Sequence, residues 1–287
     1  MQTILFGTRY IQVPTQLDEL SSKQLIKYVE LSSAKLTIEQ FNMFMLLNIL
    51  DIQNKAWLKW FFFKNEYLIP FFDTITLGFF KWKVTVIDDE DLHELSLLSE
   101  NFHKVDKFTL NNPIPRIGLL SGPGTLFNNI TFRQFRKAEE YYVKYVNSKN
   151  ENDLNTLIGW LYTLPLLPNS LKLTSEMVER NKKFFVEKLS SPERLAILYF
   201  YLENRIAITK IYRALYPKSA GKSKAKKVSH IKTKMDFEKA LRLLSGNINY
   251  DEKTDFQPCL DALAHLNDNA EEVEKITKKQ DGTMDNN

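Results

Sequence analysis

Residues 131–164 read TFRQFRKAEEYYVKYVNSKNENDLNTLIGWLYTL, and this stretch decides the fold class. Thr131 and Gln134 have the spacing of a capping box, which satisfies two backbone amides at a helix start. Apolar residues then recur at helical spacing on one face: Phe135, Ala138, Tyr142, Tyr145 and Val146. A polar turn at 148–152 leads to a second apolar run over 153–164. We therefore predict an αα-hairpin.

The opposite face of the first helix carries charged residues at a spacing of four. Arg136, Glu140 and Lys144 follow one another in this way. Side chains four residues apart are neighbours on a helix surface, so we expect the ion pairs Arg136–Glu140 and Glu140–Lys144.

Helical signals also dominate outside this hairpin. Two further capping boxes, Ser21 with Gln24 and Thr37 with Gln40, precede apolar stripes, and later helices are expected at 174–189 and from a Ser191 cap to Pro217. Only 9 glycines and 10 prolines occur, which disfavours a turn-rich all-β chain. Strand-like composition is limited to 2–13 and 75–87. We predict a mainly α fold: a multi-helix, bundle-like body with a minor β element and a C-terminal helical-pair module on a lysine-rich linker.

Turn chemistry and composition divide the chain into parts. Asn111–Pro115 and Ser121–Gly124 favour a loop, which sets the main boundary. The predicted parts are an N-terminal mainly helical part with the aromatic residues and short strands at 1–125, a helical part at 126–216, a lysine-rich linker at 217–234, a helical module at 235–277 with helices at 236–244 and about 257–276, and a disordered tail at 278–287.

Charge and cysteine content limit the classes of function. The net charge is +4, which is small for a dedicated nucleic-acid binder. A single cysteine, Cys259, excludes an intrachain disulfide and favours a reducing compartment. The longest uncharged run, 154–171, is interrupted by Pro165 and Pro168, so we expect no membrane span.

The sequence lacks a recognisable catalytic or metal-binding pattern. Asp88–Asp91 with His93 has the oxygen ligands that hard cations prefer, but acids at a helix start also complement the helix dipole without an ion, and that is the favoured interpretation. Gly221-Lys222-Ser223 resembles the end of a P-loop, yet Tyr216 stands where the first glycine belongs. We predict no enzyme activity, no metal and no cofactor.

A run of lysines is the clearest physical indication of binding. The residues are Lys218, Lys222, Lys224, Lys226, Lys227, Lys232 and Lys234. A solvated linker is the favoured interpretation. The alternative function is a nucleic-acid-associated protein that binds phosphates through Lys218–Lys234 without reading sequence. A third alternative is an acidic protein surface, such as residues 251–274 of another copy.

Aromatic residues are concentrated at 56–82, and most are expected in the core. The block holds too many rings for one face of one element, so some are candidates for a partner-binding surface. The candidates are Trp57, Trp60, Phe61 and Trp82.

Several stretches resemble a pattern in uncharacterised helical proteins of Bacteroidetes tailed phages and prophages. The resemblance is carried by Gly122-Pro123, Leu126, Asn129–Phe135, Ala138-Glu139, Asp153-Leu154, Leu157-Ile158 and Leu161-Tyr162. Further stretches that fit are Leu17–Ser21 with Gln24-Leu25, Leu195–Tyr201, and the C-terminal pair Phe237–Leu244 and Leu260–Leu266. The chain departs from the pattern at Thr163–Pro165, where Arg-Pro is usual, and at Phe237, where Trp is usual.

The resemblance implies a non-enzymatic role in virion or tail assembly, as a structural connector or a tail-assembly chaperone working by protein–protein contacts. The implied partners are other phage virion or tail proteins, with self-association as a further option. The implied location is the host cytoplasm during assembly, and the virion if the protein stays in the particle. No catalytic residue is carried over.

Overall fold

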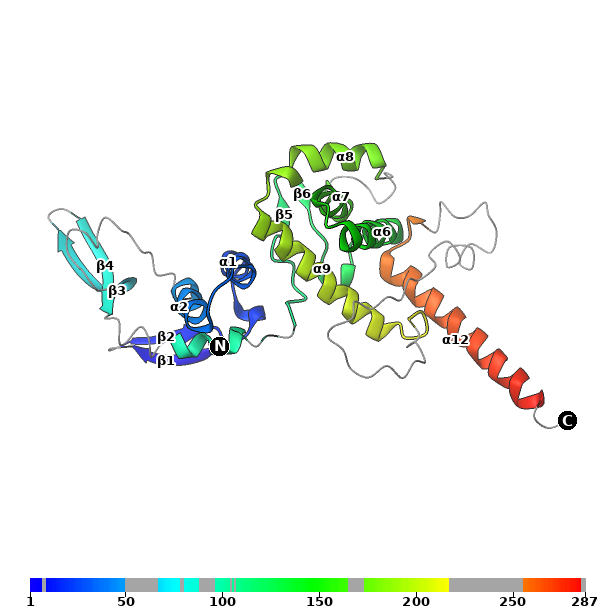
Figure 1. The fold of residues 1–287 in the computed structure, drawn as a ribbon, viewed down its shortest axis with the longest axis horizontal. Coiled ribbons are helices and arrows are strands. Elements are labelled where there is room, and N and C mark those ends of the chain that lie inside the picture. The colour runs from blue at the N-terminus through cyan, green and yellow to red at the C-terminus, as the bar shows by residue number, and fades with distance from the viewer. Residues whose placement is uncertain are drawn as a thin grey trace. The chain divides into compact units, whose positions relative to one another are not determined.

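The computed structural model describes residues 1–6, 9–49, 67–77, 80–87, 96–103, 105, 107–164, 173–216 and 255–284. The described residues are mainly helical, which confirms the predicted fold class, and their strands form three small antiparallel pairs (Figure 1). The chain divides into two compact units. Unit 1 comprises Met1–Pro113 and Ser190–Tyr199, and unit 2 comprises Ile114–Leu189 and Phe200–Asn287. The division thus lies at 113/114, while our sequence-based boundary was near 125.

Unit 1 is built on two capped helices, α1 (Ser22–Ser33) and α2 (Ile38–Ile49). The Ser21–Gln24 capping box is present, and Thr37 and Gln40 exchange the same pair of bonds. The Gln24 side-chain amide also donates to the carbonyl of Ile49 at 3.0 Å, so the start of α1 is fixed to the end of α2. The helices share a core with residues before and after them: Val13, Leu17, Leu20, Leu25, Leu31, Phe41, Met45, Ile49 and Phe102.

The described residues of unit 1 also form two β-hairpins and three short helical turns. The predicted extended arm at 2–13 is a hairpin of β1 (Gln2–Phe6) and β2 (Arg9–Val13). The second hairpin pairs β3 (Tyr67–Leu77) with β4 (Phe80–Ile87) and begins eight residues before the strand we expected at Ile75. A register shift after Pro70 explains the extra length, since it lets β3 continue past a residue without an amide donor. The short turns are η1 (Leu17–Glu19), η2 (Leu97–Ser99) and α5 (Glu100–His103).

Unit 2 contains the predicted αα-hairpin as α6 (Phe132–Ser148) and α7 (Glu151–Leu161). The Thr131–Gln134 capping box starts α6, and Lys149 ends it in the left-handed conformation with a φ of 55°. The Gln134 side chain also donates to the carbonyl of Trp160 at 3.1 Å, which joins the start of α6 to the end of α7. The capping signal in the sequence therefore also sets the packing of the two helices.

The remaining elements of unit 2 surround this hairpin. They are β5 (Arg116–Ile117), β6 (Leu120–Ser121), η3 (Thr125–Phe127), α8 (Ser175–Phe184), η4 (Val186–Lys188) and α12 (Cys259–Met284). Helix α9 (Ser191–Ile211) contributes its first part to unit 1 and the rest to unit 2. Ser190 caps α9, not Ser191 as we predicted, because Ser190 and Glu193 have the three-residue spacing that a capping box needs.

Helix α12 corrects two predictions about the C-terminus. Its first turns lie against α6 instead of standing apart as half of a tethered module, and residues 236–244 lie outside the described part of the chain (Figure 1). The helix continues to Met284, past residue 277 where we predicted a disordered tail. Lys, Glu and Gln at 271–280 have high helix propensity, which explains the continuation. Among the described residues, no helix is both long enough and apolar enough to cross a membrane.

Candidate functional site

A buried ion pair lies at the centre of unit 2. Glu139 of α6 and Arg205 of α9 meet with Nε to Oε1 at 2.6 Å, and their side chains are 5% and 8% exposed. The same carboxylate oxygen accepts a bond of 2.5 Å from the Tyr201 hydroxyl, one turn earlier on α9. The Arg205 guanidinium also lies 5.3 Å from the Tyr142 ring centre. Glu139 is thus satisfied by two donors and joins α6 to α9.

Two further groups face this pair. Tyr216 follows α9, and its buried hydroxyl has no hydrogen-bond partner among the described residues. Cys259, the first residue of α12, is fully buried. Burial and the nearby Glu139 carboxylate raise the pKa of both the Tyr216 hydroxyl and the Cys259 thiol. The cluster Glu139, Arg205, Tyr201, Tyr216 and Cys259 therefore brings three separate segments of unit 2 together.

The electrostatics of this cluster favour fixed protonation states. Burial acts to lower the pKa of Arg205, but the Glu139 carboxylate outweighs it and raises that pKa. Burial, then the same carboxylate, raises the pKa of Tyr201 well above its ordinary value. An arginine held charged and a phenol held neutral suit a structural role, since neither exchanges a proton near neutral pH.

The segment before α12 is held to α6 by backbone and side-chain bonds. The Phe132 amide donates to the Gln257 carbonyl, and the Cys259 amide donates to the Ile130 carbonyl, both at 2.9 Å. Arg136 binds both carboxylate oxygens of Asp255 at 3.1 and 2.8 Å. These bonds make 255–259 an added strand-like strap across the start of α6.

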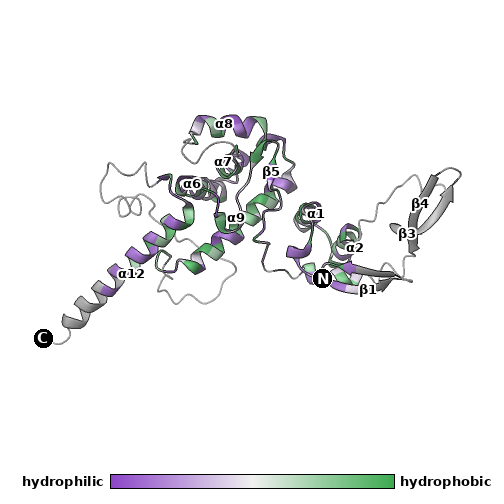
Figure 2. Ribbon diagram, turned by 180° about the vertical axis from the view of Figure 1, so that it is seen from behind, coloured by the Kyte–Doolittle hydropathy of each residue, from purple (hydrophilic) through white to green (hydrophobic). Residues whose placement is uncertain are grey.

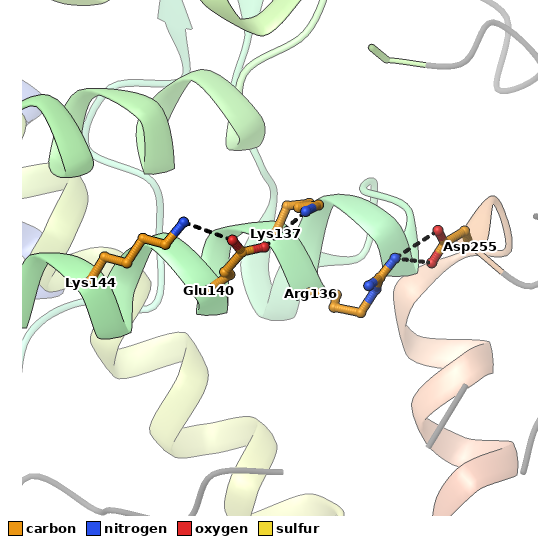
Figure 3. A network of polar contacts seen from close by, with 5 residues as sticks. All are labelled: Arg136, Lys137, Glu140, Lys144 and Asp255. Atoms are coloured by element: carbon orange, nitrogen blue, oxygen red, sulfur yellow. Dashed lines mark hydrogen bonds and ion pairs between the residues drawn. The ribbon is translucent and has the colours of Figure 1, made fainter. Parts of the chain in front are cut away.

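The charged face of α6 differs from our prediction. Figure 3 shows Glu140 between Lys137 and Lys144, both at 2.8 Å, while Arg136 points to Asp255. The prediction of an Arg136–Glu140 pair is therefore wrong, because both carboxylate oxygens of Asp255 accept from Arg136 Nη2 in a less exposed place. Burial acts to raise the pKa of Glu140, but the two lysines lower it overall.

An exposed apolar surface lies at the β5–β6 turn and the end of α8. Gly118 takes the first central position of this two-residue turn with a φ of +58°. Both common types of two-residue hairpin turn require a positive φ at that position. The Phe185 ring packs on it so closely that a Cβ at Gly118 would lie 2.7 Å from Cδ1. Leu119 and Phe184, which are the sequence neighbours of this contacting pair, are 71% and 58% exposed. We call Leu119, Phe184 and Phe185 the turn–α8 surface.

The residues that we singled out from the sequence are mostly outside the described part of the chain. Trp57, Trp60, Phe61, the Asp88–Asp91 acids and Lys218–Lys234 all fall there, and of Trp82 only the backbone, paired with Ile75 in the β3–β4 hairpin, is described. The described residues contain no group of three or more acids, histidines or cysteines placed to hold a metal.

Sequence reasoning missed both the buried cluster and the turn–α8 surface. A signal for the first exists: Glu139 shares a helical face with Phe135 and Tyr142, and Arg205 shares one with Tyr201. A charge at a core-facing position indicates a buried partner, although it does not say which one. The turn–α8 surface gives no comparable signal, because single exposed apolar residues are common on protein surfaces.

Comparison of the chain with protein-family models, with curated proteins and with solved structures found no match.

Proposed function

We propose that this protein acts without catalysis in virion or tail assembly of a tailed phage, as a structural connector or an assembly chaperone, through protein–protein contacts. The phage context comes from the sequence resemblance. The resemblance residues have structural roles: Asn129 bonds Gly122 and Gly124, Thr131 and Gln134 cap α6, and Tyr162 donates to the Ile114 carbonyl at 2.6 Å. A likeness carried by such residues concerns the scaffold.

One observation carries the contact-based mechanism. Unit 2 holds its buried carboxylate, Glu139, between Arg205 and Tyr201, while Leu119 and Phe184 stand exposed on the same unit. Buried charges that are paired and hydrogen-bonded hold helices together. Neighbouring exposed apolar side chains favour association with another surface. The combination is typical of a rigid scaffold that presents a docking surface.

The test is to follow the protein through infection. Mass spectrometry of purified virions and of infected-cell lysate should find the protein in both if it is a connector, and only in lysate if it is an assembly chaperone. In either case a tagged copy should co-purify with virion or tail proteins. A protein that stays monomeric and retains no virion component during infection would contradict the proposal.

One observation supports the alternative function, which is phosphate binding through Lys218–Lys234. Tyr216 is buried and Asp255 is bound to Arg136, so both flanks of 217–254 are fixed to unit 2. Residues 217–254 contain ten Lys or Arg and four Asp or Glu, which gives a charge of +6 (10 − 4). Because the whole chain has a net charge of +4, the rest of the chain has a charge of −2 (4 − 6). The segment between these two fixed residues is therefore the basic part of the sequence.

DNA mobility shifts separate this alternative from the assembly role. A nucleic-acid-associated protein should retard DNA at low salt and release it steeply as salt rises. Changing the seven lysines to glutamine should abolish retardation, and changing them to arginine should preserve it. Absence of any shift at low salt would contradict the alternative and leave the assembly proposal standing.

A further inference from the structure

We propose that the turn–α8 surface binds an acidic amphipathic helix of a partner protein. The inference rests on the proposed function and names the kind of partner. Its apolar part is defined by Leu119 and Phe184, the two most exposed of the large apolar residues described in unit 2, which follow and precede the contacting residues Gly118 and Phe185 in the sequence. Figure 1 shows β5 and β6 next to the end of α8.

The surface is built on rigid elements. The turn is closed by the Ile117–Leu120 pair, and both of these side chains are buried. On the other side, Val178 and Val186 are buried at either end of the Phe184–Phe185 corner. The Phe185 amide continues α8 by donating to the Asn181 carbonyl at 3.0 Å. Because the backbone is held on both sides, a partner would not have to order these residues, which lowers the cost of binding.

The charges around the apolar residues select the partner. Arg116, Lys183 and Lys188 are exposed and lie within three residues of the surface in the sequence, and none forms an ion pair with another described residue. Glu187 is an exposed acid between Lys183 and Lys188, and on α8 the exposed acids Glu176 and Glu179 pair with Arg180 and Lys182. Figure 2 shows α8 as a mixture of hydrophilic and hydrophobic residues. An apolar centre with a basic rim complements a helix that has an apolar stripe flanked by Asp or Glu.

The shape of the surface favours a helix as the occupant. Two neighbouring apolar side chains with a cationic rim match the i, i+3 or i+4 anchors of an amphipathic helix, with carboxylates on either side of the stripe. An added strand would need a free sheet edge, whereas β5 and β6 are two residues long each and Ser121 is already bridged to Thr163.

The probe is a fluorescently labelled helical peptide with a leucine stripe flanked by glutamates, titrated with the full chain and followed by anisotropy. A matched peptide with lysines in place of glutamates is the charge control. The full chain should bind the glutamate peptide at least about tenfold more tightly, a difference that shrinks as salt rises. Equal binding of both peptides, or of neither, would overturn the proposal.

Variants locate the binding to this surface. Leu119→Ser with Phe184→Ser should weaken binding of the glutamate peptide by about tenfold or more. Lys183→Glu with Lys188→Glu should reverse the preference toward the lysine peptide. Ile211→Ser is the control, because Ile211 is 54% exposed at the end of α9 and lies outside the surface. Unchanged circular dichroism and unfolding midpoint show that each variant remains folded.

Sedimentation of the full chain distinguishes a second copy as the occupant. If the chain dimerises and the Leu119→Ser and Phe184→Ser changes abolish the dimer, the surface binds another copy, and the acidic-helix proposal is overturned. Failure of peptide binding leaves the assembly role to be judged by the virion and lysate measurements. Absence from assembly, with peptide binding intact, would refute the assembly role and keep the binding site.

Discussion

At the residue scale, hydrogen-bond partners decide which buried polar groups stabilise unit 2. Glu139 accepts from both Arg205 and Tyr201, whereas the Tyr216 hydroxyl is buried without a partner among the described residues. Removing one member of a buried pair leaves the other unsatisfied, but removing a hydroxyl that has no partner relieves a desolvation cost. Two tyrosines in one cluster should therefore respond to the same substitution in opposite ways.

The Tyr201→Phe and Tyr216→Phe variants test this contrast. Tyr201→Phe should lower the free energy of unfolding by about 1.5–3 kcal/mol, because Glu139 loses a charge-assisted bond. Tyr216→Phe should leave it unchanged within about 0.5 kcal/mol or raise it. Urea unfolding followed by circular dichroism measures both, and equal losses for the two variants would contradict the assignment of partners.

Alkaline pH should destabilise unit 2 through the same residues. Burial first, and the Glu139 carboxylate second, raise the pKa of Cys259, Tyr201 and Tyr216 in the folded chain. Their folded pKa values exceed the unfolded ones, about 8.5 for Cys and 10 for Tyr. The stability that they contribute is therefore complete below about pH 8 and is lost as pH rises above these unfolded values.

The urea midpoint should fall between pH 8 and pH 10.5, and the fall should be smaller in Tyr216→Phe. Native Cys259 should also react slowly with a thiol reagent at pH 8, and quickly once urea unfolds the chain. A midpoint that stays constant across this pH range, or a wild-type slope equal to that of Tyr216→Phe, would count against a buried, neutral Tyr216.

At the element scale, the strap before α12 is fixed by a few long-range bonds. Arg136 Nη2 donates to both carboxylate oxygens of Asp255, and these side chains are 23% and 13% exposed, while Lys137 and Glu140 are 29% and 43% exposed. Exposed ion pairs contribute little because water screens them. The less exposed pair is also the one that joins elements far apart in the chain.

Arg136→Ala and the neighbouring Lys137→Ala should differ for this reason. Arg136→Ala should cost about 1–2 kcal/mol and speed amide hydrogen exchange over 255–266, since the strap loses its side-chain anchor. Lys137→Ala should cost less than about 0.5 kcal/mol and leave exchange unchanged. The same exchange pattern in both variants would show that the backbone bonds alone hold the strap.

Single-sequence reasoning located elements well where the signals are local. The three capping boxes and the αα-hairpin depend on residues three or four positions apart, and all are present. It failed for Arg136, whose real partner lies 119 residues away, because helix spacing favoured Glu140. The Glu139–Arg205 pair was also missed, because its members are 66 residues apart and local spacing does not indicate a partner at that separation.

At the scale of the whole molecule, α12 completes the core of unit 2. Cys259, Ala262, Leu263 and Leu266 are buried, Tyr212 donates to the Leu260 carbonyl at 3.3 Å, and Ala214 donates to the Asn267 side chain at 3.1 Å. A tethered module would leave the rest of the unit intact on removal. A helix that fills the core would not, because its loss exposes apolar surface and backbone groups.

Truncation distinguishes a tethered C-terminal module from a helix α12 that belongs to the core of unit 2. A chain ending at Tyr216 should lose cooperative unfolding of unit 2 or have a strongly lowered midpoint, and should bind a hydrophobic dye. A chain ending at Lys275 keeps the buried residues Cys259, Ala262, Leu263 and Leu266 of α12 and should unfold within about 0.5 kcal/mol of the full chain. If the chain ending at Tyr216 matches the full chain in calorimetry, α12 is dispensable and the separate-module interpretation returns.

By itself, the sequence determined the helical class and the positions of the capped helices, because capping and apolar periodicity depend on neighbours along the chain. Only the tertiary structure decided that α12 packs on α6, that Arg136 binds Asp255, and that Phe185 packs on Gly118. Such choices depend on which distant faces come together in a packed core, where many pairings have similar local signals and only one fits.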